Sequence, residues 1–279
     1  MSARTRRRAG RVALNVAAVV VFVCSVFPVY WMVNTAFLPG SAVKSETPHF
    51  WPDQFTLQSF QSAWNGGFLP SLGISLSVTV LTVVTALLFA FLASIAVSRY
   101  RFRSRKTFIV AILVIQMIPA EAMIISTFRV LDGWHLLNTI IGLSAVYIAM
   151  VLPFTIWTLR GFVNGVPADL EEAAMIDGCS RNQAFWRVTF PLLAPGLVST
   201  GIFAFIQAWN EFVFALVIMT RPESQTLPIW LRSFVQATKA TDWAVVMAGS
   251  TLMAIPVIVF FLIVQGKMTG GLVSGAVKG

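Results

Sequence analysis

Six long apolar runs constrain the fold of this chain more than any other feature of its sequence. A helix needs roughly 20 residues to cross about 30 Å of hydrocarbon, and each run is long enough. Helices of this kind satisfy all their backbone polar groups inside lipid. The sequence therefore predicts an all-α membrane protein with six transmembrane helices. They are expected at residues 12–38, 71–98, 107–128, 139–160, 196–219 and 243–265.

The composition supports a membrane protein and gives no sign of an enzyme. Hydrophobic residues make up 57% of the chain and charged residues 11%, whereas soluble domains have roughly 45–50% and 25%. Cys24 and Cys179 lie far apart in the predicted topology, and His49 and His135 each stand alone, so neither a disulfide nor a metal cage is indicated. We expect no catalytic residue, metal or bound cofactor in this chain.

The distribution of Lys and Arg predicts the orientation. If the N-terminus is inside, 15 of the 20 Lys and Arg residues fall in cytoplasmic segments, where cationic residues are retained during insertion. Both termini are therefore predicted to be cytoplasmic. The net charge of +9 comes largely from short arginine clusters at the membrane ends, where anionic lipid headgroups attract them. We expect contact with membrane lipid and no binding of nucleic acid.

Four other segments complete the predicted organisation. A basic cytoplasmic N-terminus covers residues 1–11, and the apolar run after it exceeds the roughly 7–15 residues of a cleaved signal peptide, so we interpret it as an uncleaved first helix. Residues 39–70 contain four prolines and form an external loop, before a transmembrane domain over 71–265. Within that domain, 161–195 is a polar cytoplasmic segment. Residues 266–279 form a cytoplasmic tail.

The polar segment has the sequence signals of two short helices. Pro167 suits a first helical turn, and the acidic residues after it favour the positive end of the helix dipole. Gly178 then ends this helix. A second helix is predicted to start at a capping box of Ser180 and Gln183. Pro191 and Pro195 are predicted to end it.

Two interpretations of this segment follow from the residues themselves. In the first, it is an amphipathic element on the headgroups, with Phe185 and Trp186 dipping into lipid. In the second, the small side chains of Ala173 and Ala174 allow a partner's backbone to approach closely, so that the first helix docks in a groove of another protein.

The stretch EEAAMIDGCSRNQAFWRVTFP, residues 171–191, resembles the EAA signature of permease subunits of bacterial binding-protein-dependent ABC importers. That pattern is Glu-Ala-Ala, three residues, Gly, nine residues, Ile, any residue, Leu and Pro. Val188 and Phe190 replace the usual Ile and Leu with other apolar residues. The matching positions here are Glu172, Ala173, Ala174, Gly178 and Pro191.

The resemblance extends nearly from end to end and is strongest to the sugar-importer branch, the maltose-type second permease. The stretches FPVYWMVNTAF, SRYRFRSR, IPAEAMII, AWNEF, TLPIWL and GLVSGAVKG are each similar to the corresponding part of that family. Ile74 and Ile95 depart from it, because the family often has Asn and Tyr there.

The resemblance implies the type I ABC importer permease fold, a location in the bacterial inner membrane, and a permease that forms half of a translocation pathway. The implied partners are a second homologous permease, two ATPase subunits that bind ATP and magnesium, and an extracytoplasmic sugar-binding protein. The implied ATPase-docking residues are Glu171, Glu172, Ala173, Ala174, Asp177, Gly178 and Pro191. Gly275 and Lys278 in the tail either contact the ATPases or belong to a disordered end rich in glycine.

Two acids lie inside predicted membrane helices. An intramembrane charge costs on the order of 3 kcal/mol, so such an acid is a functional candidate. At 1.5 Å per residue, Glu121 and Glu211 lie at a similar depth, roughly 21 and 22 Å from the cytoplasmic starts of their helices. Pro119 is expected to open the backbone beside Glu121. With Trp209 and Asn210, the acids are either substrate-path residues or structural groups that hydrogen-bond to neighbouring helices.

Two alternative functions remain open from the sequence. A proton-coupled secondary transporter would use Glu121 and Glu211 as a proton relay, but it would not explain the docking segment. A same-family permease for glycerol phosphate is the second alternative. A phosphate-bearing substrate favours arginine in its path, and the interiors of the predicted membrane helices contain none, which favours a neutral sugar. An oligosaccharide is expected.

Overall fold

The computed structural model describes residues 3–45, 47–235 and 241–275, and the side chains within 11–45, 47–235 and 241–266. Every regular element in this part of the chain is helical, and no strand occurs in it. The chain divides into two compact units, one of residues 1–68 and 231–256 and the other of residues 69–230 and 257–279.

The first unit begins with the long helix α1, Ala3–Ala36. The segment that follows, which the sequence predicts to be external, contains α2 (Gly40–Val43), α3 (Gln58–Ala63) and the π-helical turn η1 (Trp64–Phe68). Nearly every described residue of the apolar part of α1 is exposed within this chain, and Asn34, Thr35 and Ala36 at its end are buried. Apolar side chains in this state are suited to contact with lipid or another subunit rather than with water.

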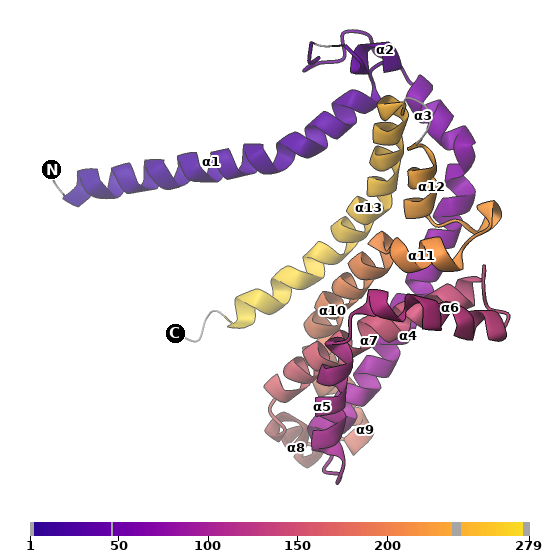
Figure 1. Ribbon diagram of the computed structural model, residues 1–279. Helices are drawn as coiled ribbons and strands as arrows, with labels where there is room; N and C mark the ends of the chain where they lie inside the picture. Colours follow the sequence, from indigo (N-terminus) through magenta and orange to yellow (C-terminus); the bar gives the residue numbers. More distant parts are fainter. Residues whose placement is uncertain (1–2, 46, 236–240, 276–279) are drawn as a thin grey trace. The chain divides into compact units, whose positions relative to one another are not determined.

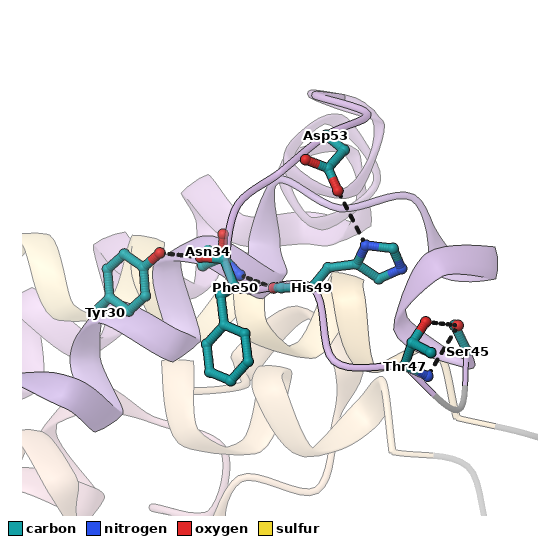
Figure 2. A network of polar contacts seen from close by, with 7 residues as sticks. All are labelled: Tyr30, Asn34, Ser45, Thr47, His49, Phe50 and Asp53. Atoms are coloured by element: carbon teal, nitrogen blue, oxygen red, sulfur yellow. Dashed lines mark hydrogen bonds and ion pairs between the residues drawn. The ribbon is translucent and has the colours of Figure 1, made fainter.

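Hydrogen bonds attach the external segment to the end of α1 (Figure 2). The side-chain amide of Asn34 donates to the carbonyl of His49 at 2.7 Å, and the hydroxyl of Tyr30 donates to the carbonyl of Phe50. The ring of His49 lies 3.3 Å from the carboxylate of Asp53. These contacts order the loop. Its prolines prevent it from forming one long helix.

The second unit is built on three helices that lie side by side, α4 (Leu69–Arg99), α7 (Ile140–Gly165) and α10 (Phe190–Asn210) (Figure 1). The buried face of α4 consists largely of small residues, which let helices approach closely where lipid supplies no hydrophobic driving force. They include Ser71, Ser75, Thr79, Thr82, Ala86, Ala90 and Ser94. Gly196 serves the same purpose on α10, since a Cβ there would lie 2.5 Å from the ring of Phe162 on α7.

The predicted third transmembrane helix, 107–128, is a sharply bent pair. It consists of α5 (Arg105–Gln116), the 3₁₀ turn η2 (Ala120–Met123) and α6 (Ile124–Gly133), with a bend of 88°. Pro119 lacks the N–H that would continue α5 and lies in a non-helical conformation, with ψ 118°. Each of the five other predicted spans overlaps a helix long and apolar enough to cross a membrane, and for the span predicted at 196–219 this helix is the stretch Arg181–Asn210.

The predicted helix over 196–219 is also interrupted. Helix α10 ends at Asn210, and a short helix α11 (Val213–Ile218) follows after Glu211 and Phe212. Beyond it come the 3₁₀ turn η4 (Pro222–Ser224), α12 (Leu227–Ser233) and the long helix α13 (Trp243–Gly275). The serine hydroxyl of Ser75 on α4 accepts a hydrogen bond of 2.7 Å from the backbone N–H of Leu227 and so holds the start of α12.

The polar segment contains α8 (Asp169–Ile176), α9 (Arg181–Ala184) and the π-helical turn η3 (Phe185–Thr189), which continues directly into α10. The prediction that Pro191 and Pro195 end the second short helix is therefore wrong. Pro191 lies in the first turn of α10, where its missing N–H is tolerated, and the backbone N–H of Phe190 reaches back to the carbonyl of Phe185 in π-helical fashion.

Candidate functional site: the cytoplasmic segment and the two helix breaks

Helix α8 carries the residues predicted to dock with an ATPase. No residue of this helix is fully buried in the chain, and Glu172, Ala173 and Asp177 are exposed while Ala174 is half-buried. The three acids of its first turn, Asp169, Glu171 and Glu172, lie at the positive end of the helix dipole. The helix therefore presents a surface that its own chain leaves uncovered, with acidic and small side chains beside the apolar Leu170 and Ile176, the latter 85% exposed.

The end of α8 is fixed by backbone geometry. Gly178 has a φ of +93°, the left-handed conformation that glycine adopts without steric cost. The N–H of Gly178 donates to the carbonyl of Met175, and that of Cys179 to the carbonyl of Ala174. The predicted capping box is confirmed, with the Ser180 hydroxyl accepting from Gln183 and the Gln183 side chain accepting from the Ser180 N–H. Glycine and capping box together set the angle between α8 and α9.

Glu171 differs from its neighbour Glu172, because it has partners within the chain. Its Oε1 accepts a 2.7 Å hydrogen bond from the hydroxyl of Thr189 and lies 3.3 Å from Nη2 of Arg99. The same Arg99 nitrogen donates to the carbonyl of Val166 at 3.1 Å. Glu171 thus faces the transmembrane helices, whereas the adjacent Glu172 is exposed. Neither Arg99 nor Thr189 had a signal in the sequence beyond its position at a helix end.

Glu211 forms the break between α10 and α11. Its Oε1 accepts from the backbone N–H of Phe214 at 2.8 Å, and its Oε2 accepts from that of Ala215 at 3.0 Å and from the hydroxyl of Tyr147 at 2.6 Å. The carboxylate therefore caps α11, satisfying two of the N–H groups that every helix start leaves without a partner. Of the two roles left open for this acid, the contacts favour the structural one.

Trp209 on α10, which precedes Asn210 and Glu211, is buried within this chain. Only 2% of this residue is exposed, and its ring is stacked on that of Phe205, which in turn is stacked on Phe260. Asn210, by contrast, is exposed and uses its amide nitrogen to donate to the carbonyl of Ile206. Gln207, one turn earlier, is exposed as well and had not been singled out from the sequence.

Glu121 lies in η2, directly after the bend at Pro119, and is exposed. Within the described part of the chain its carboxylate has no hydrogen bond or ion pair. Its neighbours Ala120 and Ile124 pack against the same hydrophobic cluster as Phe212, so the two helix breaks lie beside each other. An exposed carboxylate and two exposed amides on membrane helices are expected to face water or protein rather than lipid.

Gly275 is the last residue of α13, and Lys278 lies outside the described residues. In the part of the chain that the structure describes, no group of three or more His, Cys, Asp or Glu side chains could hold a metal ion.

Comparison with known proteins adds independent information. Residues 86–269 match the family model described as binding-protein-dependent transport system inner membrane component. The chain is 48% identical over 271 residues to the diacetylchitobiose uptake system permease protein DasC of Streptomyces coelicolor, an alignment covering 97% of this chain and 98% of the relative. It is 34% identical to the trehalose transport system permease protein SugB of Mycobacterium tuberculosis, with 91% and 93% covered.

A similar fold occurs in the crystal structure of a bacterial ABC transporter involved in the import of the acidic polysaccharide alginate. The TM-score is 0.78 at 24% sequence identity, with 95% of this chain and 98% of that chain covered.

Proposed function

Because this chain belongs to the family of inner-membrane components of binding-protein-dependent transport systems, we propose that it is a permease subunit of an ATP-driven importer of neutral oligosaccharides. The relatives named above are permeases for diacetylchitobiose and for trehalose, which are small neutral saccharides. The chain is a multi-pass protein of the bacterial inner membrane and forms part of a translocation pathway. Its termini lie in the cytoplasm, as the distribution of Lys and Arg indicates.

The partners are a second homologous permease, two ATPase subunits that bind ATP and magnesium, and an extracytoplasmic sugar-binding protein. The exposed surface of α8, from Glu172 to Gly178, docks in a groove of one ATPase. The observation that carries this proposal is that α8 is a regular helix, ended by Gly178, although none of its residues is fully buried in its own chain. A short helix in that state is prepared for a protein partner. Pro191, at the start of α10, belongs to the support of this surface.

The substrate path runs past the two helix breaks. Glu121, Asn210 and Gln207 are exposed polar groups on membrane helices, and carboxylates and amides are suitable hydrogen-bond partners for sugar hydroxyls. Trp209 and Glu211 contribute to this region structurally, because Trp209 packs against Phe205 and Glu211 caps α11. A proton relay through Glu211 is disfavoured, because three donors of its own chain already occupy its carboxylate.

Docking is tested by affinity purification from native membranes, followed by transport measurements. The wild-type permease is expected to recover an ATPase and a second permease. A Glu172→Lys variant should insert normally but lose the ATPase and sugar uptake, because the charge is reversed at the start of the docking surface. Glu223→Lys, which reverses an exposed acid of η4 outside this surface, is the matched control and should retain both. Normal uptake by the Glu172 variant would exclude docking through this surface.

A further inference from the structure

Four structural elements meet at Arg99. This residue ends α4, and its guanidinium donates to the carbonyl of Val166, the residue that ends α7. The same nitrogen lies 3.3 Å from the Glu171 carboxylate on α8, which also accepts from Thr189 at the end of η3, where α10 begins. We call Arg99, Val166, Glu171 and Thr189 the Arg99 junction. It links α8 to the cytoplasmic ends of all three helices that form the centre of the unit.

The junction is largely shielded from water. The side chains of Arg99 and Glu171 are each 22% exposed, and Thr189 and Val166 are buried. Beneath it, Val163, Val166 and Leu193 form an apolar cluster with Phe91 and Ile95. An ion pair in such a place is screened less by salt than a surface pair, and the additional hydrogen bonds to Val166 and from Thr189 keep its geometry.

Several charged residues that neighbour Arg99 and Glu171 in sequence are exposed and, within the described part of the chain, lack such an ion pair. Arg101 and Arg103 follow Arg99 closely and are exposed, as is Lys106. On α8, Asp169 and Glu172 are exposed on either side of Glu171. Of these cations and acids, Arg99 and Glu171 are the two that form an ion pair with each other. A simple cytoplasmic anchor for membrane topology does not require this, because positive charge near the helix end is sufficient.

The attachment of α8 depends strongly on this junction. Because the helix has no fully buried residue, hydrophobic packing of its own side chains contributes little to its position. The element on the other side, η3, is π-helical, a form that is rare and often occurs at functional sites. The hydroxyl of Thr189 connects α8 to this irregular turn, at the point where the chain enters α10.

We infer that the Arg99 junction is the mechanical joint of this permease, through which a displacement of α8 is passed to the cytoplasmic ends of α4, α7 and α10. The inference rests on the proposed docking of α8 with an ATPase and assigns Arg99, Glu171 and Thr189 as positioning residues for transport. It also separates two roles within the acidic pair. Glu172 faces the ATPase, and Glu171 faces the joint.

Loss of the joint has a distinct consequence. The exposed surface of α8 remains available, so the ATPase still binds and still hydrolyses ATP. Movement of α8 is then no longer passed to the helices, and fewer sugar molecules are transported for each ATP. Loss of docking, in contrast, removes the ATPase from the complex.

The test uses the complete importer in proteoliposomes with its sugar-binding protein, and measures sugar uptake and ATP hydrolysis in the same sample. Arg99→Gln removes the ion pair and the hydrogen bond to Val166, Glu171→Gln removes the ion pair, and Thr189→Val removes the hydrogen bond to Glu171. Arg101→Gln and Asp169→Asn are matched controls, because each removes an exposed charge of the same sign, Arg101 just after the end of α4 and Asp169 on the same helix as Glu171. The sugar-to-ATP ratio should fall by roughly fivefold or more in the junction variants, the lower end of usual coupling between sites. ATPase association should be retained in all five.

Three further results decide the inference. The losses of coupling caused by Arg99→Gln and by Glu171→Gln should be less than additive in the double variant, because the two changes remove the same ion pair. A wild-type ratio in Arg99→Gln and Glu171→Gln, even with reduced thermal stability, would overturn the joint and leave a purely structural pair. Loss of the ATPase from Glu171→Gln would also overturn it, by placing Glu171 in the docking surface. Absence of any ATPase from the wild-type complex would refute the proposed function itself. If Arg99→Gln fails to fold, the sugar-to-ATP ratio of Thr189→Val tests the inference in its place.

Discussion

The hydroxyl of Tyr147 donates a 2.6 Å hydrogen bond to Oε2 of Glu211 and thereby connects α7 to the break between α10 and α11. Tyr147 is 2% exposed, so this contact lies inside the unit. The break itself needs the carboxylate, since Glu211 replaces backbone carbonyls as acceptor for two N–H groups of α11. A helix interruption inside a membrane is tolerated where its backbone groups find such partners.

Removal of this contact should lower stability. We expect Tyr147→Phe to reduce the free energy of unfolding in detergent by about 1–3 kcal/mol, because a hydrogen bond to a charged group is lost while the ring is kept. Glu211→Gln should cost at least as much, since it weakens the cap of α11 as well. Tyr30→Phe, which removes a hydroxyl from the external segment, provides a control in a different part of the chain. An unchanged unfolding midpoint in both variants would contradict the structural role of Glu211.

In contrast to the changes at Tyr147 and Glu211, substitution of Glu121 should change sugar uptake and leave stability unaffected. Because this side chain is exposed and the described part of the chain gives it no partner, Glu121→Gln should leave thermal stability unchanged. If it lines the substrate path, the change should raise the KM for sugar uptake by about 5- to 10-fold, as expected for the loss of a hydrogen bond worth roughly 1–1.5 kcal/mol. Glu211→Gln is the paired comparison, since it should mainly change stability. Equal uptake by wild type and Glu121→Gln at all sugar concentrations would remove Glu121 from the path.

Gly178 and Gly165 offer a matched pair of substitutions. In both positions an added Cβ would meet no atom within 4 Å, so the backbone conformation alone decides the effect. Gly178→Ala forces alanine into a left-handed conformation and should cost about 1–2 kcal/mol at the end of α8. Gly165→Ala, at the end of α7 and without a positive φ, should be neutral or slightly stabilising. Hydrogen exchange of the α8 amides is the measurement, and equal exchange in the two variants would contradict this account.

Asn138 should anchor the external loop after α11. It has a φ of +58°, and its Oδ1 accepts from the backbone N–H of Arg221 at 2.9 Å and from the hydroxyl of Ser224 at 3.0 Å. Asn138→Gly keeps the backbone conformation and removes these bonds, so it isolates the contribution of the side chain. Amide exchange over residues 220–226 should increase in this variant, while exchange in α4 stays unchanged. Protection equal to wild type would show that the loop is ordered without Asn138.

The sequence by itself determined the class of this protein. Long apolar runs separated by polar segments leave helices as the solution in lipid, and the residues from Glu172 to Pro191 carry a signature whose family assignment the comparisons confirm. The cap at Ser180 and the turn at Gly178 were also predictable, because both depend on residues close together in the chain.

Only the tertiary structure decided which polar residue has which role. Glu171 and Glu172 are adjacent and chemically identical, yet one faces Arg99, 72 positions earlier in the chain, and the other is exposed. Glu121 and Glu211 were likewise equivalent as intramembrane acids, until the contact with Tyr147 distinguished them. The burial of Trp209 has the same origin. Local patterns define helices and their ends, but the partners of a side chain depend on which distant helices pack against it, and this information does not reside in the spacing of neighbouring residues.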